Sequence, residues 1–98
     1  MRPIFSDRAE RDLESIGNYI AEDNPRRAVS FLKELRVACE DLVETPLRFA
    51  ELDGFGHLGW RRRIHGRYAI IYVFDQNKLT ILRVLTLAMD MKSVLDLN

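Results

Sequence analysis

Apolar residues in the first half of the chain recur at helical spacing. One stripe has intervals of four, three and four residues: Ala9, Leu13, Ile16 and Ile20. Such intervals place the residues on one face of an amphipathic helix. A second stripe follows, with Ala28, Leu32, Leu35, Cys39 and Leu42. Asn24-Pro25 lies between the stripes, where Asn caps a helix and Pro suits its first position. Since so short a connection joins antiparallel neighbours, the pattern predicts a helical hairpin.

The residues around this hairpin predict how it begins and ends. Arg2 to Phe5 form a short strand, which Pro3 places at a sheet edge or strand start. Ser6-Asp7 is expected to cap the first helix, with Asp7 and Glu10 forming a capping box. Pro46 ends the second helix.

The second half of the chain changes to the period of strands. Three runs are separated by short turns, which predicts an antiparallel meander: Trp60–His65, Tyr68–Phe74 and Leu79–Leu87. A glycine-containing loop over 47–59 precedes them, and the tail from Asp90 to Leu97 is expected to add a short helix. The fold class is therefore α+β, one domain over 1–98 with an N-terminal strand, an α-helical hairpin and a three-stranded antiparallel meander.

Neither face of the predicted sheet is polar. Alternation puts Tyr68, Ile70, Tyr72 and Phe74 on one side, and Ala69, Ile71 and Val73 on the other. The same alternation sets Ile81, Arg83 and Leu85 against Leu82, Val84 and Thr86. We expect the hairpin to cover the smaller aliphatic side, which leaves an open partner surface bearing Tyr72 and Arg83. The alternative is that the long loop and the tail fold over this surface.

Composition is that of a globular domain. The 98 residues are 47% apolar and 31% charged, with no apolar run long enough to span a membrane and no signal-peptide pattern at the start. We therefore expect a cytoplasmic protein without membrane contact, in which the single Cys39 is reduced and buried.

Charge is unevenly spread. Residues 1–59 hold 8 basic and 12 acidic residues, a net charge of −4, whereas 60–98 hold 7 and 3, a net charge of +4. The basic excess gathers in Arg61, Arg62, Arg63 and Arg67. Such a cluster favours an acidic partner, either protein or nucleic acid.

The order of motifs resembles the ParE toxins of the RelE/ParE superfamily. The resemblance rests on Phe5 to Leu13, Tyr19-Ile20-Ala21, Asn24-Pro25, Gly59 to Arg63, Arg67-Tyr68, and Ile81 to Leu85 with Asp90 beyond. It implies one strand, two helices and a three-stranded meander in a twisted antiparallel sheet. It also implies a toxin of a type II toxin–antitoxin system that inhibits DNA gyrase, is neutralised by a ParD-like antitoxin in a hetero-oligomer, and does not itself bind DNA.

The chain departs from the family pattern after the last strand. Relatives commonly read Leu-His-Gly or similar there, whereas this chain has Thr86 to Met89. The RelE relatives cut messenger RNA on the ribosome, a reaction that needs a general base and a proton donor. Thr86 and Met89 supply neither, so we expect no enzyme activity. A ribosome-dependent endonuclease and a detoxified antitoxin-binding module remain as alternatives.

Candidate binding residues follow from charge, aromatic character and the resemblance. Arginine forks suit an acidic antitoxin segment and large apolar side chains anchor interfaces, so the antitoxin-binding set is Trp60, Arg61, Arg63, Tyr72, Arg83 and Leu85. The target-binding set is Arg67, Met89 and Asp90. One cysteine and two separated histidines make no credible metal site, and no cofactor motif is present.

Overall fold

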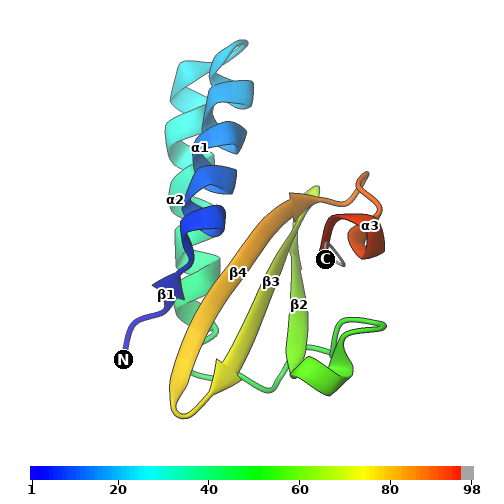
Figure 1. Ribbon diagram of the computed structural model, residues 1–98. Helices are drawn as coiled ribbons and strands as arrows, with labels where there is room; N and C mark the ends of the chain where they lie inside the picture. The colour runs from blue at the N-terminus through cyan, green and yellow to red at the C-terminus, as the bar shows by residue number, and fades with distance from the viewer. Residues whose placement is uncertain (96–98) are drawn as a thin grey trace.

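A helical hairpin packs against one face of a four-stranded sheet, and a short C-terminal helix lies on the other face (Figure 1). This computed structural model describes residues 1–95. The elements in chain order are β1 Ile4–Phe5, α1 Asp7–Ala21, α2 Pro25–Asp41, the 3-10 helix η1 Gly56–Leu58, β2 Trp60–His65, β3 Tyr68–Asp75, β4 Lys78–Thr86 and α3 Met91–Leu95. The predicted α+β class is confirmed.

The sheet is mixed, with the order β1-β4-β3-β2. The meander is antiparallel as predicted, but β1 pairs with β4 in parallel. Between β3 and β4, Gln76 and Asn77 have φ of 50° and 62°. Two successive left-handed residues are what a two-residue hairpin turn requires, and Asn tolerates this conformation better than most residues.

Side-chain caps fix both helices of the hairpin. Ser6 Oγ accepts a hydrogen bond from the Ala9 amide at 3.0 Å, so Ser6 caps α1 and Asp7 is its first residue. The predicted capping box that begins at Asp7 is therefore wrong by one position. Asn24 Oδ1 accepts from the Arg27 amide at 3.1 Å and Pro25 is the first residue of α2, as predicted.

The hairpin covers the aromatic side of the meander. Its apolar stripes enclose, with the sheet, a core that includes Ile70, Tyr72, Leu79 and Ile81. The prediction that it covers the smaller aliphatic side is wrong. The large ring of Tyr72 fills the space between the layers, and its hydroxyl donates to the Pro46 carbonyl at 2.9 Å, so burial leaves no polar group unpaired.

A β-bulge reverses part of the predicted alternation in β4. Ile71 pairs with Arg83, whereas the next residue, Tyr72, pairs with Ile81, and Leu82 is the extra residue. One inserted residue moves the following side chains to the opposite face. Arg83 therefore shares a face with Ile71, and the prediction that it lies beside Tyr72 is wrong.

The second face of the sheet, which we call the far face, is covered in its middle. Leu52 and Phe55 of the loop form a cluster with Ala69 and Ile71, and side chains of α3 pack against it. The prediction of an open face bearing Tyr72 is thus wrong, because the hairpin covers it. The alternative that the loop and tail cover that face is also wrong, because they cover the opposite, smaller aliphatic side. Residues 96 and 97 of the predicted tail helix lie outside the described residues.

Residues at the start of the chain seal the outer edge of β4. The Ser6 amide donates to the Ile81 carbonyl at 3.0 Å, and Ser6 Oγ donates to the Leu82 carbonyl at 2.8 Å. Further along, Asp12 accepts from the Val84 amide at 2.9 Å. Since β1 has only two residues, α1 takes over the pairing that a longer edge strand would provide. These bonds fix α1 beside β4.

Cys39 offers a direct test of the packing between hairpin and sheet. It is a free, fully buried cysteine, and burial raises the pKa of its thiol to about 12. Only the thiolate reacts, so a thiol-disulfide reagent at pH 8 should label the folded protein roughly 1,000-fold more slowly than the chain in denaturant. Absorbance of the released thiol measures both rates. Similar rates would contradict a buried position for Cys39.

Candidate partner-binding grooves

The first surface hollow lies between α1 and the end of β4. This α1–β4 groove has a volume of about 390 Å³ and is lined by Asp12, Ser15, Ile16, Tyr19, Arg67, Tyr68, Val84, Leu85, Thr86 and Met89. Two large side chains on its rim reach solvent, since Tyr19 is 71% exposed and Met89 is 45% exposed. The groove therefore offers apolar surface that the described chain does not cover.

The helical period explains which residues of α1 face this groove. The core stripe that starts at Ala9 has intervals of four, three and four, and a second stripe one position earlier comprises Arg8, Asp12, Ser15 and Tyr19. Residues one position away are rotated by about 100° around a helix, so the second stripe flanks the first and borders the core. Of this stripe, Asp12, Ser15 and Tyr19 line the α1–β4 groove.

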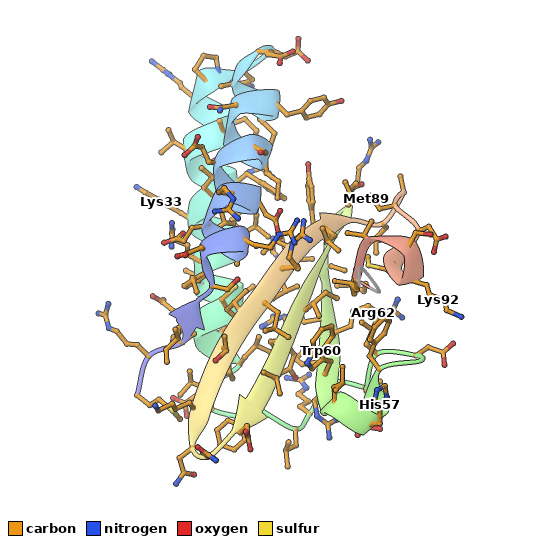
Figure 2. All side chains as sticks on the ribbon, viewed as in Figure 1. Lys33, His57, Trp60, Arg62, Met89 and Lys92 are labelled. Carbon is orange, nitrogen blue, oxygen red and sulfur yellow. The ribbon has the colours of Figure 1, made fainter. Side chains whose placement is uncertain are left out.

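The second hollow, which we call the far-face trough, consists of two adjoining cavities of about 310 and 630 Å³. Trp60 and Leu95 line both cavities. Trp60 stacks on Phe55 with ring centroids 5.3 Å apart and planes 7° apart. Figure 2 shows Trp60, Arg62, His57 and Lys92 gathered on the side of the sheet away from the hairpin, whereas Lys33 lies on α2.

An ion pair stands at the junction of the groove and the trough. Asp12 lines the groove, Arg83 lines the smaller cavity of the trough, and the two side chains form a bidentate pair. The Nε–Oδ2 distance is 2.8 Å, the Nη2–Oδ1 distance is 3.0 Å, and each side chain is 15% exposed. The hydrogen bond that Arg83 donates to Asp12 raises the pKa of Arg83, against the lowering effect of burial. Arg83 thus already has an internal carboxylate partner.

Two other predicted arginines hold parts of the chain together. Arg61 donates to the Phe49 carbonyl at 2.7 Å and lies 3.9 Å from the Glu51 carboxylate. Arg63 donates to the Ala38 carbonyl at 2.8 Å, and its guanidinium lies 5.1 Å from the ring of Phe49. Their geometry ties β2 to the preceding loop and to the end of α2. Each guanidinium therefore already binds one acceptor within the chain.

The predicted antitoxin-binding residues fall on two faces of the sheet. Tyr72 is 0% exposed on the hairpin face, and Arg61 pairs with it across the strands. Arg63 pairs with Ile70 on that same face. The structure places the remaining three, which are Trp60, Arg83 and Leu85, along the far face and its border. The six therefore do not form one surface.

The predicted target-binding residues divide in a different way. Arg67 and Met89 both line the α1–β4 groove, close to Leu85. Asp90 instead borders the trough and caps α3, where it accepts from Ser93 Oγ at 2.8 Å and from the Lys92 amide at 3.1 Å. The bonds from Ser93, followed by that from Lys92, lower the pKa of Asp90. Its carboxylate has a local structural use.

Sequence reasoning missed three residues that line these hollows: Arg8, Tyr19 and Arg62. Tyr19 was part of a quoted motif, but its place on the stripe beside the core was not used. Strand alternation puts Arg62 on the opposite side of β2 from Arg61 and Arg63, and its partner on β3, the buried Ile71, lies on the far face. Both signals were present in the sequence.

The two histidines lie apart from each other in the structure. His57 borders the trough, whereas His65 lies 3.8 Å from Glu34 at the side of α2, so neither histidine lines the α1–β4 groove. Over residues 1–95, no group of three or more His, Cys, Asp and Glu side chains could hold a metal ion. In the same part of the chain, no helix has the length and apolar character to cross a membrane.

The structure is that of a small α+β protein with a mixed four-stranded sheet and two surface hollows. The model of the family described as the ParE toxin of the type II toxin–antitoxin system parDE matches residues 4–91, and the chain belongs to this family. The structure is similar to a solved chain from the chromosomal ParDE toxin–antitoxin system of P. aeruginosa, with a TM-score of 0.73 and 16% identity. That match covers 88% of this chain and 95% of the other. No curated protein matches the sequence significantly.

Proposed function

We propose that this ParE-family toxin acts by binding DNA gyrase and is neutralised when a ParD-like antitoxin occupies the α1–β4 groove. The observation that carries the proposal is the family match over residues 4–91, together with an apolar groove that the described chain leaves open. Exposed apolar surface on a small domain commonly marks a partner site.

The chemistry of the groove favours an amphipathic, acidic partner segment. Tyr19 and Met89 provide exposed apolar contacts on its rim, and Leu85 lies at its floor with 2% exposure. Arg67 lines the groove and forms no ion pair with another residue of 1–95. An amphipathic segment that carries carboxylates would pack its apolar side chains against Tyr19, Met89 and Leu85. One of its carboxylates would then pair with Arg67.

The same groove offers a physical route to neutralisation. Arg67 and Met89, which are the candidate target-binding residues, lie beside surface that an antitoxin would cover. A bound antitoxin would thus mask them directly. Toxin and antitoxin form a hetero-oligomer under this proposal, and binding to the folded toxin raises its melting temperature by mass action.

Parallel activity assays test the proposal. Purified toxin added to gyrase should abolish supercoiling, and toxin first mixed with the antitoxin encoded beside its gene should leave supercoiling intact. Added to a translating ribosome extract, it should produce no discrete cuts in messenger RNA. Cuts without gyrase inhibition would replace this proposal with the endonuclease alternative. Antitoxin binding without gyrase inhibition would support the detoxified module instead.

A further inference from the structure

Helix α3 lies across the middle of the far-face trough. Its residues Met91 and Leu95 pack on the far-face cluster, and Leu95 lines both cavities of the trough. Trp60, on the sheet, also lines both cavities. Leu95 and Trp60 together therefore separate the two cavities of the trough. Helix α3 thus stands between the cavity beside Ser6 and Arg8 and the cavity beside Phe55.

The attachment of α3 is weak. The polar bonds of this segment are local: the Val94 amide donates to the Asp90 carbonyl at 3.1 Å, and the Asp90 carboxylate bonds Lys92 and Ser93. Among residues 1–95, no hydrogen bond or ion pair joins 91–95 to another helix or strand. A helix of five residues is far too short to be stable alone, so its position depends on two apolar side chains.

Helix α3 also lies at the limit of the family pattern. The family model ends at residue 91, the first residue of α3. The family model therefore covers the sheet and hairpin that form the trough, and its match ends where α3 begins. Regions with few buried contacts and no tertiary hydrogen bonds open at low free-energy cost.

We infer that α3 is a displaceable placeholder, which occupies the far-face trough until an amphipathic acidic segment of the antitoxin replaces it. This inference rests on the proposed function and extends the antitoxin's path from the α1–β4 groove, past the Asp12–Arg83 pair, into the trough. Charge supports an acidic occupant, because Arg8 and Arg62 line opposite cavities and neither is ion-paired within residues 1–95. Asp53 and Asp90 line the larger cavity with negative charge, but the Asp90 carboxylate is already bound by Ser93 and Lys92.

The inference has a quantitative consequence for affinity. A partner that binds only the open state loses affinity in proportion to the fraction of molecules that are open. Minor states of this kind are commonly populated at about 0.1–10%. Removal of α3 should therefore tighten antitoxin binding by at least about tenfold, mainly through faster association.

The single tryptophan makes the placeholder directly observable. Trp60 fluorescence can be quenched with acrylamide in three chains: the parent, a chain ending at Asp90, and a matched control ending at Leu95 that keeps α3. The chain ending at Asp90 should be quenched at least twofold more strongly than the other two. Equal quenching in all three would overturn the inference, because α3 would then not shield the trough.

Titration of the same three chains with the antitoxin completes the test. The chain ending at Asp90 should bind at least tenfold more tightly than the parent and the control; equal or weaker binding would overturn the inference. Should that chain fail to fold by circular dichroism, the Met91→Ser, Leu95→Ser double variant replaces it in both measurements. Absence of antitoxin binding by every chain would instead reject the proposed function, while the quenching result still decides whether α3 covers Trp60.

Discussion

Asp12→Ala is expected to lower the free energy of unfolding by about 2–4 kcal/mol, more than the loss of an ordinary surface charge. The variant leaves the Arg83 guanidinium without its bidentate partner, although that side chain is only 15% exposed. It also leaves the Val84 amide without an acceptor at the outer edge of β4. Removal of one partner from a largely buried pair is costly because the other charge stays behind.

Urea unfolding followed by circular dichroism measures this effect. Asp12→Asn keeps one oxygen as an acceptor and should lose roughly half as much stability as Asp12→Ala. The matched control is Arg27→Ala, which breaks an ion pair with Glu34 whose side chains are 47% and 45% exposed, and the midpoint should not change. If Asp12→Ala unfolded at the same urea concentration as the parent, the Asp12–Arg83 pair would not hold α1 to β4.

The Asp12–Arg83 pair also complicates the interpretation of antitoxin affinity measured on an Arg83 variant. Arg83→Ala removes a member of the predicted antitoxin-binding set, but it also leaves the Asp12 carboxylate without its ion-pair partner. Stability and affinity would then fall together, and affinity would not report on contact with a partner. A double-mutant cycle of Asp12→Ala with Arg83→Ala separates the pair from the partner contact.

The order of elements could be predicted from the sequence because local signals fix it. Two helical stripes separated by Asn24-Pro25, and three strands separated by tight turns, each determine their own element. The faces of the sheet were less predictable. Simple alternation cannot foresee a bulge, and the one at Leu82 moved Arg83 from the side of Tyr72 to that of Ile71.

The partners of a charged side chain were also beyond sequence reasoning. Arg61 and Arg63 looked like free cations, yet both bind backbone carbonyls at 12 and 25 residues' separation. Such partners depend on tertiary placement and leave no periodic signal. The exposure of Tyr19, in contrast, could have been predicted from the sequence. Helical spacing alone places Tyr19 one position from the core stripe. An aromatic residue on that border was a signal available from the start.

Tyr19→Ala is expected to weaken antitoxin binding at least tenfold, which is about 1.4 kcal/mol or more. Tyr19 is 71% exposed on the rim of the α1–β4 groove, so its ring has little contact to lose within the toxin and much to gain from a partner. Isothermal titration calorimetry with the antitoxin measures the change. The control is Val37→Ala, a residue 53% exposed on α2 and outside this groove, which should bind like the parent.

The melting temperature and the dissociation rate of Tyr19→Ala show whether its loss of affinity comes from the groove. The melting temperature of Tyr19→Ala should match that of the parent, because an exposed ring contributes little to the core. The loss of affinity should appear mainly as faster dissociation, since steering by Arg67 and the other cations is unchanged. If Tyr19→Ala and Val37→Ala bind equally well, the antitoxin does not use the α1–β4 groove. The proposed masking of Arg67 and Met89 by the antitoxin then has no structural basis.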